Sequence, residues 1–490
     1  MRSIKFFFIL GLLIKSQLWA PLFFSSRNNI IRVLPTGHLN IGQPITLYDG
    51  TLIKRPGGVI SGETISFDYG FYEDVLGSAF LKAIYDPDVD GISLEGNSFL
   101  NGIAGTLLET VTISGVDNLI QGQPLFSNMI YMLDASTTVT LTLQSKLNQS
   151  IYLNGGTIYL GADLQFIPGT GIGGFGTINA NGYSIILSGD LNFSSSVVIN
   201  DASEFRLGGD SILTGLVTFN GNTVLNFNGN AALFSPVGIA TIGPNSRITF
   251  KNGSFQHVQA NNIICSAGST LEFQGSSCYF DADFTFTSGS LLIRDMVTFV
   301  GTCTFVYQSV ETSTILAESQ LILDSGFTFS YDPLSTSDNL INFEDSSAQL
   351  VLNGGALRAT ETGIHLTKGT MVVQENSYIS AASSADYAHG FVLGDATLAN
   401  DFTINILGGR NLYFEYGNFV YNNESIYALN TQNPRTVLQI GDDCRLVLYN
   451  SMDIGSGQAR FLYNTTLAAA NNSILIGNVL PVGVINLENI

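Results

Sequence analysis

The sequence predicts an all-β protein, most of it a right-handed parallel β-helix, which is a solenoid of stacked coils. Three observations predict this fold: the composition, a recurrent strand triplet, and the spacing of that triplet. Charged residues make up only 12% of the 490 residues, and 52 glycines stand among short apolar runs. This composition is typical of many strands joined by tight turns. Hydrophobic residues, at 45%, are numerous enough to fill a long core.

The triplet consists of an apolar residue, a small polar residue and phenylalanine. Its alternation has the period of a β-strand with one apolar face. Many successive copies stand 23 to 27 residues apart, a spacing that one solenoid coil requires. Stacked coils place equivalent phenylalanines in an interior ladder. We therefore expect the following side chains to be buried: Phe166, Phe193, Phe250, Phe273 and Phe329.

One coil can be compared with a known pattern. Residues 176–187 read GTINANGYSIIL. This segment resembles the coil pattern of pectin-lyase-like right-handed β-helices, a group that includes polysaccharide lyases, polygalacturonases, phage tailspikes and autotransporter passengers. The resemblance covers residues 150–490 and concerns the fold. It implies a β-helical scaffold and leaves the activity open, because one fold serves many functions.

The N-terminus is typical of a secretory signal peptide of a bacterial-type protein. Arg2 and Lys5 precede nine apolar residues that end at Ile14. That run is too short to span a bilayer, which needs roughly 20 apolar residues. We expect residues 1–20 to be removed on export, with cleavage as late as residue 26. The mature protein is then periplasmic, at the cell surface or extracellular, without a transmembrane segment.

Residues 27–150 are less periodic than the rest of the chain. They are expected to form an N-terminal cap or small domain, and residues 151–490 the parallel β-helix. A cap shields the first coil from pairing with other chains. One helix is expected in the cap, because apolar residues between Phe71 and Ile84 recur with the spacing of one helix face.

The charge restricts the partners. A net charge of −20 argues against nucleic acid, because an anionic chain cannot displace the counterions of phosphates. Acidity of this kind is common in exported proteins that must stay soluble. Surface glycans and host or envelope proteins are the partners that an exported rod of this kind would meet.

The candidate metal site is an acidic loop. Asp86, Asp88 and Asp90 alternate before Gly91, as in the first half of a calcium loop, and Glu95 can supply a further oxygen. The second half departs from the EF-hand pattern, since its twelfth position is an asparagine rather than a glutamate. This departure favours an ordinary acidic loop over a calcium site.

The candidate catalytic groups would belong to a calcium-dependent lyase. Asp163, Asp190 and Asp283 each precede a triplet, and Arg294 or Arg445 would be the base. A repeated aspartate before a strand is more typical of a turn cap than of an active site. We therefore favour a ladder of turn-capping aspartates.

The four cysteines contain no pair with the spacing of a metal ligand set. Cys278 and Cys303 are 25 residues apart, so we expect them in neighbouring coils. Whether they form a disulfide is open at this point.

The leading functional hypothesis is an exported, non-catalytic β-helix with a surface, adhesive or structural role. A polysaccharide-active lyase or hydrolase is the alternative, based on the use of this fold for that chemistry. An outer-membrane β-barrel is a second alternative, which the absence of an aromatic C-terminal residue opposes.

Overall fold

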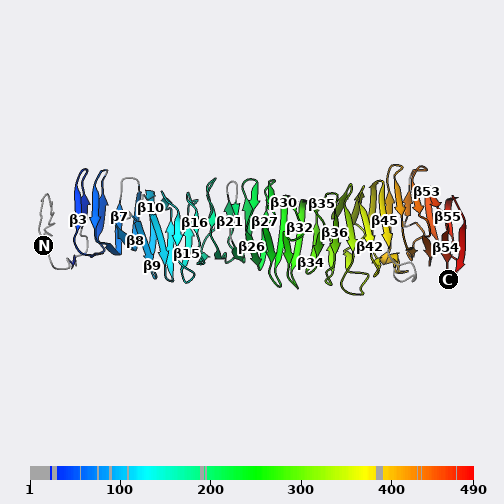
Figure 1. The fold of residues 1–490 in the computed structure, drawn as a ribbon, viewed down its shortest axis with the longest axis horizontal. Helices are drawn as coiled ribbons and strands as arrows, with labels where there is room; N and C mark the ends of the chain where they lie inside the picture. The colour runs from blue at the N-terminus through cyan, green and yellow to red at the C-terminus, as the bar shows by residue number, and fades with distance from the viewer. Residues whose placement is uncertain are drawn as a thin grey trace.

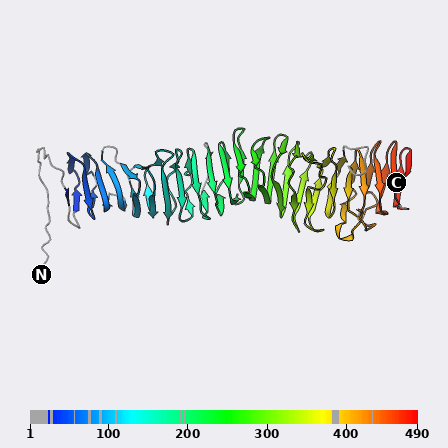
Figure 2. The same cartoon turned by 90° about the horizontal axis from the view of Figure 1, so that it is seen from below.

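A computed structural model describes residues 23–490 except 25–29, 56, 74–76, 88–90, 108–109, 188–191, 194–195, 382–389, 428, 432 and 471. The predicted signal segment lies outside the described residues and stays a prediction. The described chain forms a long rod in which successive coils follow one another from the N-terminal to the C-terminal end (Figures 1 and 2). The fold is a parallel β-solenoid of about 20 turns, which confirms the predicted fold class.

The coils are held together by ladders of parallel strands. The described strands make up one sheet of 21 strands, one of 18, one of nine, one of six and one of two. Five neighbouring strands of the 18-stranded sheet cross the middle of the rod: β24 (Glu204–Leu207), β27 (Asn222–Asn226), β30 (Arg247–Val258), β32 (Thr270–Phe280) and β34 (Ser290–Arg294). Helical structure in the described chain is confined to one 3-10 turn, η2 (Leu398–Asn400).

The length of a coil varies more widely than the sequence predicts. The separation along the chain between two paired residues of neighbouring coils gives the length of one coil. It is 19 residues between Ser93 and Thr112, and 29 residues between Gln320 and Gln349. Many coils in the first half have 19 to 21 residues, below the predicted 23 to 27. Because the extra residues lie in the turns between strands, the ladders stay in register.

The interior of the rod is a continuous apolar core with phenylalanine ladders. Phe166, Phe250, Phe273 and Phe329 are all buried, as predicted, whereas the side chain of Phe193 lies outside the described set. The rings of Phe250 and Phe273 are in register on β30 and β32 with centroids 5.5 Å apart. Edge-to-face contacts at this distance add to the stabilisation from apolar burial.

The helix predicted from Phe71 to Ile84 is wrong. This segment belongs to two antiparallel strands, β7 (Ile65–Glu73) and β8 (Gly77–Asp86). Leu81, for example, is buried while its neighbour Lys82 faces outward, which is a period of two. An apolar run of this length is compatible with the period of a helix and with that of a strand. The pairing of β8 with strands on both sides makes it a strand.

Residues before 150 also form parallel coils. Strands β2 (Ile30–Val33) and β5 (Thr51–Lys54) pair in parallel near the N-terminal end. Across residue 150, β15 (Thr138–Leu143) pairs in parallel with β17 (Thr157–Leu160). The region predicted as a cap therefore contains solenoid coils, interrupted by the antiparallel strand β8. Its role as a cap stays a prediction.

Candidate functional site

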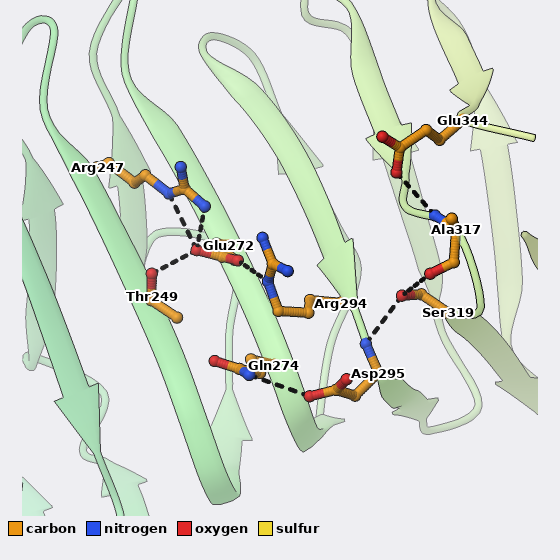
Figure 3. Close-up of polar contacts among 9 residues, drawn as sticks. All are labelled: Arg247, Thr249, Glu272, Gln274, Arg294, Asp295, Ala317, Ser319 and Glu344. Atoms are coloured by element: carbon orange, nitrogen blue, oxygen red, sulfur yellow. Dashed lines mark hydrogen bonds and ion pairs between the residues drawn. The ribbon is translucent and has the colours of Figure 1, made fainter.

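The most elaborate polar cluster in the described residues surrounds Glu272. The Oε2 atom of Glu272 accepts hydrogen bonds from Arg247 Nε at 3.0 Å, from Arg247 Nη2 at 2.7 Å and from Thr249 Oγ1 at 2.5 Å. Its Oε1 atom accepts one from Arg294 Nε at 2.8 Å. Arg247, Glu272 and Arg294 come from three successive coils, on β30, β32 and β34 (Figure 3).

Strand alternation explains why Glu272 points outward. Its neighbours Leu271 and Phe273 are buried in the interior, so Glu272 lies on the outer face of the sheet. The Glu272 side chain is nevertheless only 2% exposed, while Arg247 and Arg294 are each 42% exposed. The two arginine side chains therefore cover the carboxylate and keep their own outer surfaces in solvent.

The environment sets the ionisation of Glu272. Burial raises the pKa of this carboxyl, but the hydrogen bonds from Thr249, Arg294 and Arg247 outweigh burial and leave the pKa below its ordinary value. The carboxylate is thus held charged between two guanidinium groups. A buried charge needs such partners, because an unpaired one would be costly.

The network extends along the rod. Gln274 donates a hydrogen bond to Asp295 at 3.1 Å, and the Asp295 backbone N–H donates to the Ser319 hydroxyl at 3.0 Å. Further on, the Ala317 N–H donates to the Glu344 carboxylate at 2.8 Å (Figure 3). Polar side chains therefore link successive coils on the outside of the rod, in addition to the backbone ladders.

An open hollow of about 330 Å³ lies next to Arg247. It is lined by hydroxyl, amide and guanidinium groups with one apolar side chain: Ser203, Asn222, Thr223, Val224, Arg247 and Thr249. The Thr223 hydroxyl is buried and has no hydrogen-bond partner within the described protein. A surface of this composition suits a small polar group that also offers some apolar area.

Basic residues gather on this side of the rod. Between Lys146 and Arg358 the sequence contains four lysine and arginine residues in all: Arg206, Arg247, Lys251 and Arg294. All four lie on the outer face of β24, β30 and β34. We call the outer side of strands β24, β27, β30, β32 and β34 the basic face.

Two of the three candidate aspartates, Asp163 and Asp283, bind backbone groups in the structure. Asp163 accepts a hydrogen bond from the Ser184 N–H at 2.9 Å, and Asp283 accepts one from the Thr304 N–H at 2.8 Å. Each carboxylate thus binds a backbone donor 21 residues later, in the next coil. This confirms the favoured interpretation of capping aspartates for these two residues. Asp190 lies outside the described residues.

The structure does not assemble these aspartates with a base. Asp163 and Asp283 precede strands of two different sheets, the 18-stranded and the nine-stranded one. Five strand-to-strand steps separate their coils, which corresponds to about 24 Å along the rod. Arg294 pairs with Glu272, and Arg445 pairs with Glu488.

The candidate calcium loop is described only in part. Asp86 ends β8 and pairs with Gly91, the first residue of β9 (Gly91–Glu95). Glu95 stands four residues further along β9, about 13 Å from that turn, so the strand carries it away from Asp86. Asp88 and Asp90 lie outside the described residues. Within the described part of the chain, no three His, Cys, Asp or Glu side chains are grouped for a metal ion. The calcium site stays a prediction.

The cysteines are free thiols. Cys278 is in register with Phe299 of the next coil, and the Cys303 thiol lies 3.6 Å from the Phe280 carbonyl oxygen. The predicted placement of Cys278 and Cys303 in neighbouring coils is therefore confirmed. Burial raises the pKa of the Cys303 thiol to about 11, and it raises the pKa of Cys278 as well.

The Glu272 cluster was not predicted from the sequence. A usable signal is present, since Glu272 follows Arg247 by 25 residues and Arg294 follows Glu272 by 22. Charged residues at the coil period are rare in a chain with so few charges. Their coincidence on one face becomes visible once the coil lengths are known.

The described part of the chain contains no helix with the length and hydrophobicity of a membrane span. The fold and the basic face define the class of this protein as a parallel β-solenoid with a polar outer network. Comparison with protein-family models, with curated proteins and with solved structures gave no match. Its function is therefore argued from its own residues.

Proposed function

We propose that this protein is an exported, non-catalytic β-solenoid with a surface role, structural or adhesive. The proposal rests on one observation: the candidate catalytic groups that the structure describes already form hydrogen bonds within the protein. Asp163 and Asp283 bind backbone N–H groups, and Arg294 holds Glu272. A general base must be free to take a proton from a substrate, and a guanidinium bound to a buried carboxylate is not.

The rod architecture supports the same proposal. Each coil contacts its neighbours through continuous backbone ladders, so the protein presents a long, regular outer surface. Proteins of this shape offer repeated contacts along their length. A surface-bound rod can use such contacts to hold a partner without altering it.

An activity assay tests the non-catalytic part. The purified protein is incubated with acidic and neutral polysaccharides with and without calcium, and unsaturated products and reducing ends are followed. We expect no turnover. Turnover that is lost on Asp283→Ala or Arg294→Gln would replace this proposal with the polysaccharide-active enzyme, for which the hollow beside Arg247 is the supporting observation.

Export has its own test. The full chain is expressed in a Gram-negative host with a Sec pathway, and the mature N-terminus is read by mass spectrometry. We expect cleavage between residues 20 and 26. An uncleaved chain retained in the cytoplasm would contradict the export part of the proposal.

A further inference from the structure

The register of the strands places the cations of the basic face in order. One row of outward positions runs Arg206, Asn226, Lys251, Gln274 and Arg294, each paired with the next across adjacent strands. We call these five residues the basic row. Cations and amides alternate along it, so a cation recurs at every second coil.

The spacing of these cations is set by the fold. Adjacent strands of a sheet lie about 4.8 Å apart, so cations at every second strand are about 9.6 Å apart. The three cations therefore mark a straight line parallel to the axis of the rod. Asn226 and Gln274 stand between them with side chains that can accept or donate hydrogen bonds.

The three cations of the basic row remain accessible to a ligand. Lys251 has no ion-pair partner among the described residues, and it is partly exposed. Arg294 uses its Nε atom for Glu272, and its side chain is 42% exposed. Arg206 pairs with Glu204 at 2.5 Å, and its side chain is 44% exposed.

The negative charges on this face are fewer than its positive ones. Glu204 and Glu272 stand among the four cations, and Asp295 lies at the edge, where it accepts a hydrogen bond from Gln274. The chain as a whole is strongly acidic, with a net charge of −20. The basic face is thus a local attractive site for an anion on a rod that otherwise repels anions.

We propose that the basic face binds a linear acidic polysaccharide that carries one acidic group per disaccharide, lying parallel to the rod axis. Such a polymer repeats its charge at a distance comparable to that between cations of the basic row. The intervening uncharged sugars would lie against Asn226 and Gln274.

The charge spacing distinguishes this ligand from other polyanions. A polymer with an acid on every sugar, or a nucleic acid, places negative charges opposite the amides as well as the cations. Its additional charges would lie opposite Asn226 and Gln274, which supply no positive charge. The inference rests on the proposed adhesive role and names its partner class.

Binding is measured by surface plasmon resonance on the full chain at physiological salt. The probes are hyaluronan, which has one carboxylate per disaccharide, polygalacturonate, which has one on every sugar, and neutral dextran. We expect hyaluronan to bind most tightly and dextran not to bind. Lys251→Gln is expected to weaken hyaluronan binding by roughly three- to tenfold, because it removes the central cation of the row.

Matched variants control for charge and folding. Lys146→Gln removes the same charge at an exposed position elsewhere on the rod and should leave binding unchanged. Lys251→Arg should retain binding. Equal affinity for polygalacturonate, or equal losses for Lys251→Gln and Lys146→Gln, would overturn the inference. Absence of binding together with absence of cleavage would overturn it while leaving the non-catalytic proposal intact, whereas shortening of hyaluronan would contradict that proposal.

Discussion

The Asp283 carboxylate accepts a 2.8 Å hydrogen bond from the backbone N–H of Thr304, which stands 21 residues later in the next coil. The same relation holds for Asp210 with Ala231 and for Asp442 with Tyr463, each also 21 residues apart. A carboxylate at the turn thus accepts a hydrogen bond from a backbone N–H group that has no partner in the strand ladder. This hydrogen bond connects the start of one strand to the turn that precedes the paired strand in the previous coil.

We predict that Asp283→Ala loosens this junction. The loss of a hydrogen bond to a charged acceptor should cost about 1–3 kcal/mol locally. Hydrogen exchange at the Thr304 amide should therefore become faster by about fivefold or more. The control is Asp281→Ala, which removes an exposed carboxylate that pairs with His257. Unchanged protection of Thr304 in Asp283→Ala would contradict the capping role.

Removal of the buried charge at Glu272 should destabilise the middle of the rod. Glu272→Gln leaves Arg247 and Arg294 facing each other without a carboxylate between them. We expect a loss of about 1–3 kcal/mol in the free energy of unfolding, measured by urea denaturation. Glu204→Gln is the matched control, because Glu204 is more exposed and pairs with one arginine. A larger loss in the control than in Glu272→Gln would refute this prediction.

Glu272 should also make stability depend on pH. Its pKa in the folded state lies below the ordinary value of 4.5. Its contribution to stability is therefore fully present above about pH 4.5 and is lost as the pH falls through the folded pKa. Asp134, Asp345 and Asp395 also have pKa values lowered by hydrogen bonds, so they act in the same direction.

The comparison between the wild type and Glu272→Gln isolates the contribution of Glu272. The difference in unfolding free energy between the two proteins should shrink as the pH is lowered below 4.5. Thermal and urea unfolding at several pH values measure it. A difference that stays constant, or that grows on acidification, would show that Glu272 is not held ionised by its arginine partners.

Cys303 should be the first cysteine to react. Burial is the main cause that raises the pKa values of the thiols, to about 11 at Cys303 and about 12 at Cys265 and Cys444. Cys278 is fully buried, whereas Cys303 is partly exposed. Labelling of the native protein with maleimide, followed by mass spectrometry, should modify Cys303 before the others. The reaction should accelerate as the pH rises, and labelling in concentrated guanidinium should reach all four cysteines.

The interior ladder should be sensitive to truncation. Phe305 is buried and its ring lies 5.4 Å from that of Phe284 and 5.3 Å from that of Phe329. Phe305→Ala should cost about 3–5 kcal/mol, because it opens a cavity between three coils. Phe175→Ala is the control, since that ring is 53% exposed. Similar midpoints of unfolding for the two variants would show that the ladder adds little to stability.

The architecture could be predicted from the sequence because strand alternation and coil repetition are local signals. Leu271 and Phe273 alternate with Glu272, and this pattern alone places the first two inside. The coil length could not be predicted well, since the triplets come from different sheets. Phe219 lies on β26 (Leu216–Asn220) of the 21-stranded sheet, whereas Phe250 lies on β30 of the 18-stranded one. Distances between such positions do not measure one turn.

The basic face could not be predicted for the same reason. Arg247 and Glu272 are 25 residues apart, although the backbone partner of Glu272 is Thr249. Their contact depends on the reach of the Arg247 side chain across two register positions, which the sequence does not encode locally. The helix prediction was wrong for a different reason. A short apolar run carries no information about the strands that pair with it on either side.

The unequal length of the coils has a practical consequence. The 29-residue step between Gln320 and Gln349 contains a turn from Asp332 to Leu340, in which Leu334 is 70% exposed, and the flanking ladders remain intact. A turn that already tolerates extra residues should accept a foreign peptide at little thermodynamic cost, since loop closure entropy grows slowly with length. The rod can therefore serve as a carrier that displays inserted epitopes or enzymes at defined heights along its axis.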